Sequence, residues 1–271
     1  MIIGIVGSSG TLGRILSEQL SLRGHELRLF SRQSEIRDFR TDVLTDMPPA
    51  QLSKVDCVIY LAWATTDRST NLQNKHAEAA GLWAKHCNAI GVKFLFVSTV
   101  LAHEVTRSKY GEYKLKAEKL VAESDGNSVR IGSVVDDAYP LLLTKLRSLG
   151  MKMPLVGSLF NWPIYAVSST TVATMIEQIV LRWSSRCIYW CAPSIPTNLA
   201  TIMLSGSNRR VHLKVLSRLM AVVARFPIYG TKMDALRGLV GQIPTLEIFD
   251  VIEVFDINEF DWKLSIYGEA A

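Results

Sequence analysis

The chain has 271 residues, of which 48% are hydrophobic and 20% are charged, so it can bury the core of one or two domains. This composition excludes a disordered chain, and four cysteines without a CxxC pair exclude a disulfide scaffold. The formal net charge is +5, but carboxylates separate the Lys and Arg residues, so we expect an anionic small ligand and no nucleic acid.

No apolar run approaches the roughly 20 residues that a membrane-spanning helix needs, so we expect no membrane partner. The four cysteines, Cys57, Cys87, Cys187 and Cys191, lie in apolar segments. Reduced, buried thiols in a cytoplasmic protein are the simplest interpretation, and no metal site is predicted.

The first two thirds of the chain alternate short β-type runs with helical patterns, which is typical of βαβ units. Strands are predicted at residues 2–6, 26–30, 57–62, 93–98, 128–131 and 187–191. Helices are predicted at residues 11–24, 71–90, 110–123, 140–150 and 170–183. The expected fold class is therefore α/β, a Rossmann-type doubly wound parallel sheet.

After about residue 136 this alternation becomes irregular, which indicates a second lobe interleaved with the first. We expect an NAD(P)-binding Rossmann domain at residues 1–135, with residues 165–193 returning to it. Residues 136–164 and 194–271 would form a smaller substrate-binding lobe. This lobe includes a basic amphipathic stretch at residues 209–225, which we interpret as a helix with a solvated face.

A glycine-rich turn follows the first predicted strand: Gly7-Ser8-Ser9-Gly10-Thr11-Leu12-Gly13. Gly7 would permit a tight turn, Gly10 would let the backbone approach a pyrophosphate, and Gly13 would let the helix pack closely. The helix N-terminus would supply amides and a positive dipole end. The turn predicts a dinucleotide site, because a strand precedes it and an amphipathic helix follows.

The second predicted strand ends at Ser31 and Arg32, where a site that prefers NAD usually has a carboxylate. Ser31 and Arg32 would instead accept a 2′-phosphate. NADP(H) is therefore favoured, and NAD(H) stays possible.

Tyr110 and Lys114 form a Y-x-x-x-K pattern near the start of a predicted helix. Their spacing puts both on one helical face, so the ammonium can lower the pKa of the phenol, which can then exchange a proton with a carbonyl or hydroxyl oxygen. The hydroxyls of Ser98 and Thr99 end the preceding strand, at the sheet edge where α/β folds bind ligands.

Together these motifs resemble the extended branch of the short-chain dehydrogenase/reductase superfamily, the NAD(P)-dependent sugar epimerase/dehydratase/reductase family, over about residues 1–185. The remaining matches are Asp42-Val43, Leu61-Ala62-Trp63, Asn74, the run from Tyr110 to Glu118, and Arg130-Ile131-Gly132-Ser133-Val134-Val135. The resemblance implies cofactor contacts from the glycine turn, including Ser9, Thr11 and Leu12, and from Ser31, Arg32, Asp42, Val43, Leu61, Ala62, Trp63, Ser98, Tyr110, Lys114 and Ile131.

The resemblance also implies roles in catalysis. Tyr110 would be the general acid/base, Lys114 would bind the nicotinamide ribose, and Thr99 would hydrogen-bond the reacting oxygen, with Ser98 as the alternative. Tyr113 is excluded as the acid because Ala117, not a lysine, stands four residues after it.

Three departures from the family pattern affect the function. Val100 and Leu101 replace the Asp-Glu pair of dehydratases, so dehydration is disfavoured. Residues 161–165 lack the family's Arg-Asp-Tyr segment. Trp63 stands where the family has a small residue. The leading hypothesis is an NADP(H)-dependent reductase that acts on a carbonyl group of a sugar or nucleotide-sugar. The alternatives are a nucleotide-sugar epimerase and a non-catalytic dinucleotide-binding sensor or assembly subunit. The family's frequent helical dimers make a homodimer possible.

Overall fold

The structure is a computed structural model. It describes residues 1–35, 39–65, 69–106, 108–136, 138–139, 141, 145–146, 148, 163–193, 196–203 and 253–254. The predicted helix at 140–150 lies mostly outside the described residues, and the basic stretch at 209–225 lies wholly outside them.

The described residues form a main sheet of seven parallel strands in the order β11-β9-β5-β4-β3-β1-β2. Its strands, in sequence, are β1 (Ile2–Val6), β2 (Glu26–Phe30), β3 (Cys57–Tyr60), β4 (Lys93–Thr99), β5 (Asn127–Ile131), β9 (Ile188–Cys191) and β11 (Glu253–Val254). The chain first winds outward from β1 to β2 and then returns to β3 on the other side of β1. This reversal is the switch point at which open α/β sheets bind ligands.

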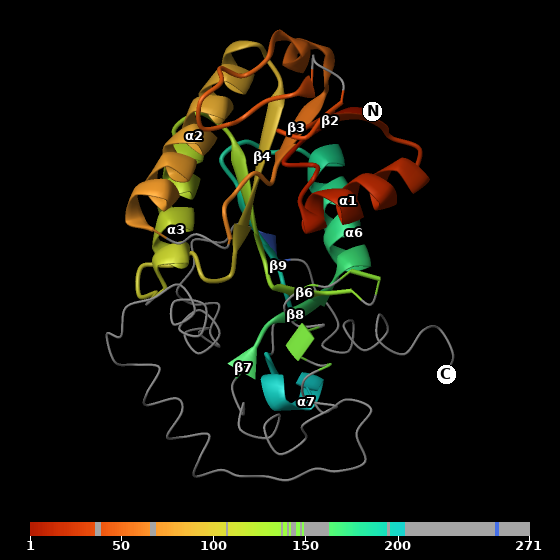
Figure 1. The fold of residues 1–271 in the computed structure, drawn as a ribbon, viewed down its shortest axis with the longest axis vertical. Coiled ribbons are helices and arrows are strands. Elements are labelled where there is room, and N and C mark those ends of the chain that lie inside the picture. The colour runs from red at the N-terminus through yellow and green to blue at the C-terminus, as the bar shows by residue number, and fades with distance from the viewer. Residues whose placement is uncertain are drawn as a thin grey trace.

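Helices cover both faces of the sheet (Figure 1). The helices that cover it are α1 (Thr11–Leu22), α2 (Thr70–Ala89), α3 (Lys109–Ala122) and α6 (Ser169–Leu181), and a 3-10 turn η2 (Ala50–Lys54) precedes β3. Helices α1 and α6 contact each other on one face, and α2 and α3 pair on the other. The expected doubly wound α/β fold is confirmed.

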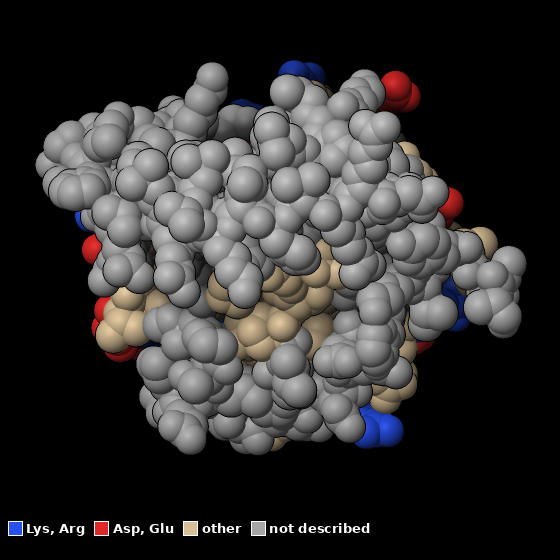
Figure 2. Space-filling view, turned by 90° about the horizontal axis from the view of Figure 1, so that it is seen from below, with Lys and Arg blue, Asp and Glu red and all other residues tan. Residues whose placement is uncertain are grey.

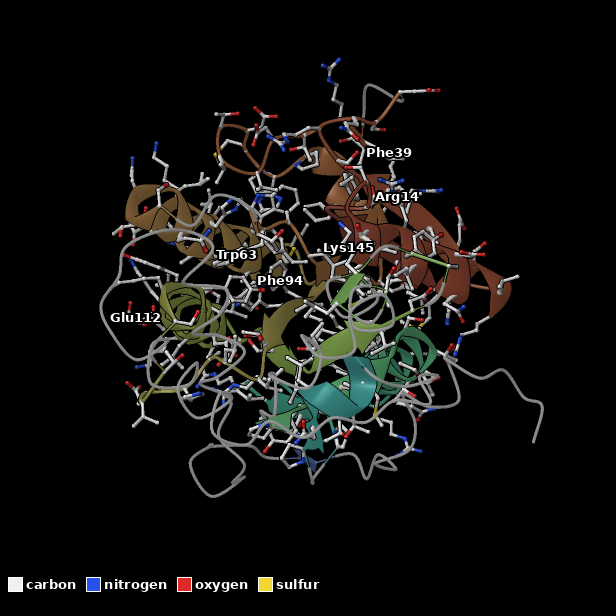
Figure 3. All side chains as sticks on the ribbon, turned by 60° about the horizontal axis from the view of Figure 1, so that its bottom comes forward. Arg14, Phe39, Trp63, Phe94, Glu112 and Lys145 are labelled. Atoms are coloured by element: carbon white, nitrogen blue, oxygen red, sulfur yellow. The ribbon has the colours of Figure 1, made fainter. Side chains whose placement is uncertain are left out.

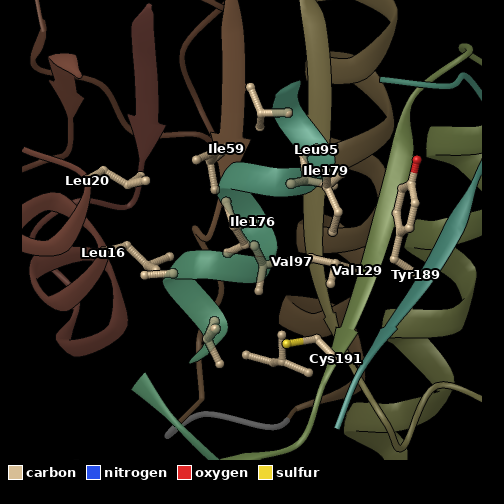
Figure 4. Packing of buried hydrophobic residues seen from close by; sticks show 14 of the residues in the cluster. Leu16, Leu20, Ile59, Leu95, Val97, Val129, Ile176, Ile179, Tyr189 and Cys191 are labelled. Carbon is tan, nitrogen blue, oxygen red and sulfur yellow. The ribbon is translucent and has the colours of Figure 1, made fainter. Parts of the chain in front are cut away.

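Alternation along the strands divides the core between these two faces. Ile59, Leu95 and Val97 pack under α1 and α6 with Leu16 and Ile176 (Figure 4). The residues between them in sequence turn to the other face: Val58, Tyr60, Phe94 and Phe96 pack under α2 and α3. Each central strand is thus buried on both sides, which explains its continuous apolar run.

The smaller strands lie beyond the carboxyl ends of the main sheet, at the bottom of Figure 1. They are β6 (Ser133–Val135), β7 (Pro163–Ile164), β8 (Ala166–Ser168) and β10 (Thr197–Asn198), and helix α7 (Leu199–Met203) follows them. Strand β6 pairs in parallel with β8, and β7 pairs antiparallel with β10.

Most predicted elements end within three residues of the observed ones, but two expectations need correction. The strand predicted at 57–62 ends at Tyr60, so that Leu61, Ala62 and Trp63 form the segment after β3. Residues 253–254 were assigned to the smaller lobe, but they pair with β9 in the main sheet.

Beyond β2, the described residues add a single parallel bridge between Ser31 and Arg40. The four cysteines are buried free thiols, as predicted, and Cys187 and Cys191 belong to one core cluster. Among the described helices, none is long and apolar enough to cross a membrane.

Candidate active site

The glycine turn after β1 has the tight geometry predicted for it. Gly7 has φ of +89°, and its N–H donates to the Phe30 carbonyl oxygen at 2.9 Å. A Cβ atom on Gly7 would lie 2.7 Å from the backbone nitrogen of Ala62. A Cβ on Gly13 would lie 2.8 Å from Ser8 Cα, so both glycines are needed for the close approach of turn, helix and neighbouring strand.

The N-terminus of α1 opens at this turn. Gly10 is its N-cap residue and is exposed, no side chain caps the helix, and the first turn carries no acidic residue. Ser9 and Thr11 are partly exposed beside it, whereas Leu12 packs against the core. Exposed amides at a positive helix end suit the pyrophosphate of a dinucleotide, so this part of the chain fits the predicted cofactor.

Residues after β2 flank the same switch point. The Ser31 hydroxyl is buried and accepts from the Gln33 N–H at 3.3 Å. The Arg32 side chain is 76% exposed, and its nearest guanidinium nitrogen lies 3.9 Å from an Asp42 carboxylate oxygen. Arg32 is therefore available to an anionic ligand at this end of the sheet, while Asp42 also accepts from the Leu44 N–H.

The segment after β3 lies between the glycine turn and α2. Leu61 donates its N–H to the Val6 carbonyl, and Leu61 packs against the core on the α1 side. Val43, Ala62 and Trp63 pack together against the core on the α2 side. Three of the predicted cofactor-contacting residues, Val43, Ala62 and Trp63, therefore pack against one core cluster.

Gly111 sets the position of Tyr110 relative to the end of β4. A Cβ on Gly111 would lie 2.7 Å from Thr106 Oγ1 and would also collide with the Leu101 carbonyl oxygen. Helix α3 can therefore start directly against the segment that follows Thr99. Its N-cap is Ser108, whose hydroxyl accepts from the Gly111 N–H at 3.4 Å.

Thr99 ends β4 with a side chain that is 9% exposed, and its Oγ1 accepts from the Leu101 N–H at 3.4 Å. Ile131 ends the neighbouring strand β5, and its carbonyl accepts from the Val100 N–H at 3.1 Å. Tyr110 is partly buried on the first turn of α3. The three expected catalytic residues therefore come from adjacent elements at one edge of the sheet.

Lys114 is buried, and its amine is surrounded by aromatic rings. Its Nζ donates to the Val97 carbonyl oxygen at 2.8 Å and lies 4.2 Å from the ring centroid of Trp63 and 4.4 Å from that of Phe96. The centroid of the Tyr110 ring is 5.8 Å away. Burial lowers the pKa of Lys114 to about 7, although the nearby Glu118 carboxylate opposes this shift.

A buried ion pair between Arg130 and Glu118 lies next to Ser98 and Lys114. Arg130 on β5 donates to both carboxylate oxygens of Glu118 on α3, with its closest nitrogen at 2.7 Å. Burial raises the pKa of Glu118, and the guanidinium works in the opposite direction. Ser98 is 2% exposed and its side chain works to lower the pKa of Glu118, so it lies toward this carboxylate rather than toward open surface.

The carboxyl edge of the sheet is the face seen in Figure 2, and the described residues visible at its centre are neither acidic nor basic. Charged residues appear at the rim of this view. Tyr165 and Trp190 form part of the apolar cluster near this edge, together with Val100 and Ala192.

No protein-family model and no curated protein sequence matches the chain. Solved structures do match it. UDP-N-acetylglucosamine 4-epimerase from Bacillus cereus superposes with a TM-score of 0.62 at 14% identity, over 77% of this chain and 81% of the other. A hypothetical dTDP-4-dehydrorhamnose reductase from Sulfolobus tokodaii gives 0.61 at 22% identity, over 78% and 84%. UDP-glucose 4-epimerase from Thermus thermophilus, in complex with NAD, gives 0.60 at 17% identity, over 89% and 98%.

The chain therefore shares the fold of these epimerases and this reductase. In this fold the glycine turn, the end of β4 and the start of α3 share one edge of the sheet, as the resemblance implied.

Sequence reasoning did not single out Gln73, His76 or Phe96 as part of this candidate site, and it gave Gly111 no role beyond the matched run from Tyr110 to Glu118. His76 stacks on Trp63 with ring centroids 5.4 Å apart. The sequence feature that could have indicated these neighbours is Trp63, because a large side chain at a position that is small in the family must contact or displace the side chains around it. Phe96 lies three residues before Thr99 at the end of β4, and no pattern in the sequence distinguishes it from a core residue.

Proposed function

We propose that the protein is an NADP(H)-dependent oxidoreductase that reduces a carbonyl group on a sugar or nucleotide-sugar. The observation that carries this proposal is the convergence, at one sheet edge, of an uncapped helix behind a glycine turn with Thr99, Tyr110 and Lys114. The uncapped helix and glycine turn suit a dinucleotide, and the three side chains suit proton transfer to a carbonyl oxygen.

The dinucleotide would lie across the switch point between β1 and β3. The amides of Thr11 and Leu12 would hold the pyrophosphate beside Gly10, whose own N–H donates to the Gly7 carbonyl oxygen. Asp42 and Val43 would contact the adenine end. Leu61, Ala62 and Ile131 would line the path toward the nicotinamide. When bound, the nicotinamide supplies or accepts a hydride.

The chain's own residues would handle the proton and the position of the substrate. Tyr110 would donate a proton to the carbonyl oxygen, and Thr99 would hydrogen-bond the same oxygen and orient it. Lys114 would contact the ribose and favour the ionised form of Tyr110 once the proton has left.

The preference for NADP(H) rests on Arg32. Its guanidinium is exposed at the end of β2 and has one carboxylate, Asp42, at the edge of ion-pair distance. A 2′-phosphate would compete well for such an arginine, since Arg binds phosphate through two parallel hydrogen bonds.

Release of bound dinucleotide tests the proposal first. The purified protein is denatured, any dinucleotide is identified, and the cofactor-free protein is titrated with NADPH and with NADH. The proposal expects an empty or exchangeable site that prefers NADPH. Stoichiometric, tightly held NAD would favour an epimerase instead, and binding of neither dinucleotide would contradict every redox function.

A turnover test follows for a protein that binds NADPH. Oxidation of NADPH is measured by absorbance with keto-sugars and with nucleotide-linked keto-sugars. Saturable oxidation with one of these classes is expected. Binding without turnover on any carbonyl would favour the non-catalytic sensor or assembly subunit.

A further inference from the structure

The amine of Lys114 contacts one backbone carbonyl and two aromatic rings. One hydrogen is donated to the Val97 carbonyl, and two aromatic faces, those of Trp63 and Phe96, lie within 4.4 Å of Nζ. Phe96 is fully buried in the sheet, whereas Trp63 is partly exposed in the segment after β3. Trp63 is therefore the part of this cage that separates the amine from solvent.

Trp63 is fixed from α2, on the face of the sheet that α2 and α3 cover (Figure 3). The indole Nε1–H donates to Gln73 Oε1 at 2.7 Å, and Gln73 Nε2 donates to the Ala64 carbonyl at 2.9 Å. The Ala64 N–H donates to His76 Nε2 at 3.2 Å, and the His76 ring stacks on the indole. A loop segment with three such bonds to one helix has a defined position, and so has the ring that it carries.

We propose that Trp63 is a positioning residue of this site: its indole, fixed by Gln73 and His76, holds the Lys114 amine in a dry position beside Tyr110. The inference rests on the proposed role of Lys114, but the state of the amine can be measured without cofactor or substrate. A cage of this kind keeps a flexible side chain in one place before the dinucleotide binds, which reduces the entropy lost on binding.

The charged and titratable groups around Lys114 allow a clear expectation for its ionisation. They are Glu118 and Tyr110 on its own helix, Arg130 on β5 and His76 on α2. Glu118 is engaged by Arg130, and burial lowers the pKa of His76 to about 4, so His76 is neutral above pH 6. Burial of the amine, to which the Trp63 ring contributes, is then the main factor that lowers the pKa of Lys114.

Titration of Lys114 by NMR tests this proposal. The cofactor-free full chain is labelled with ¹³C-lysine, the Cε resonance of Lys114 is assigned from its loss in Lys114→Met, and its pKa is measured. The wild type is expected to titrate near 7. Trp63→Ala is expected to raise this pKa by about one unit or more, because water reaches the amine, and Trp63→Phe by less than about half a unit.

Two further variants separate positioning from general loss of packing. Gln73→Leu removes the amide that holds the indole and is expected to give a pKa between those of wild type and Trp63→Ala. Trp83→Phe changes another α2-side tryptophan, fully buried in the core, and is expected to leave the Lys114 pKa unchanged. Gln73→Leu also keeps the test decisive where Trp63→Ala does not fold.

The proposal is overturned if Lys114 of the wild type titrates with the pKa of an exposed lysine. It is also overturned if the Lys114 pKa is equal in the wild type, Trp63→Ala and Gln73→Leu. The pH dependence of the NADPH dissociation constant is measured on the same variants and should shift with the Lys114 pKa. Failure of NADPH binding in the wild type would instead contradict the proposed function and leave the titration result standing.

Discussion

Tyr110 and Tyr113 lie on the same helix, but only Tyr110 has Lys114 four residues after it and a ring in contact with Trp63. We predict that Tyr110→Phe lowers kcat/KM by about 100-fold or more, because the proton donor is lost while the ring is kept. NADPH affinity should change little. Tyr113→Phe is the matched control and should keep near-normal turnover in the same NADPH-oxidation assay; equal activity of both variants would contradict the assignment of Tyr110.

Gly7 and Gly24 both have positive φ, of +89° and +84°, but they differ in their surroundings. Nothing lies within 4 Å of a Cβ on Gly24, whereas a Cβ on Gly7 meets the backbone of Ala62. Gly24→Ala should therefore cost only the backbone strain, about 1 kcal/mol. Gly7→Ala should cost clearly more and also weaken dinucleotide binding, as measured by denaturant unfolding and NADPH titration. Similar losses for both variants would show that the contact with Ala62 has no effect.

At the scale of elements, the pair formed by Glu118 and Arg130 joins α3 to β5 in the core. The two side chains are 1% and 4% exposed. Arg130→Met leaves a buried carboxylate without its partner, so we predict a loss of about 3–5 kcal/mol in the free energy of unfolding. The double variant Arg130→Met/Glu118→Leu should recover most of this loss.

Lys119→Met provides the control for this pair, because Lys119 lies on the same helix and its ion pair with Glu104 is exposed. Its expected effect is below about 1 kcal/mol. A comparable loss in Lys119→Met and Arg130→Met would contradict the importance of burial.

Elements with strong periodic patterns were predictable, and contacts between them were not. The apolar runs of β1, β3 and β4 and the spacing of Leu16 and Leu20 on α1 predict the sheet and its helices directly. By contrast, β6 and β8 have three residues each and only become strands by pairing across more than thirty residues. Gln73 and His76 contact the site from the side of α2, ten and twelve residues beyond the loop atoms that they bind, so no local motif marks them.

At the scale of the whole molecule, His76 links the candidate site to stability in acid. Burial, with a contribution from Lys114, lowers its pKa from 6.5 to about 4. On acidification the unfolded chain takes up this proton first, so the stabilisation from neutral His76 is complete above about pH 6.5 and is lost as the pH falls toward 4. We predict that between pH 7 and 4.5 this one group accounts for a loss of about 2 kcal/mol.

The variant His76→Phe keeps a ring against Trp63 and cannot titrate. Its free energy of unfolding should be lower at pH 7, since the Ala64 N–H loses its acceptor, but should depend less on pH than that of the wild type. Denaturant unfolding at the two pH values measures this difference. Parallel pH profiles for the two proteins would contradict the prediction.

The single bridge between Ser31 and Arg40 has a consequence for self-association. Among the described residues little else is paired beyond β2, so this strand is close to an open edge, and edges of this kind invite strand exchange and aggregation between molecules. Glu26 and Arg28 alternate along β2 and form an ion pair at 2.5 Å, which places charge where a second strand would have to dock. Neutralising both side chains should leave the fold intact while lowering the concentration at which the protein precipitates.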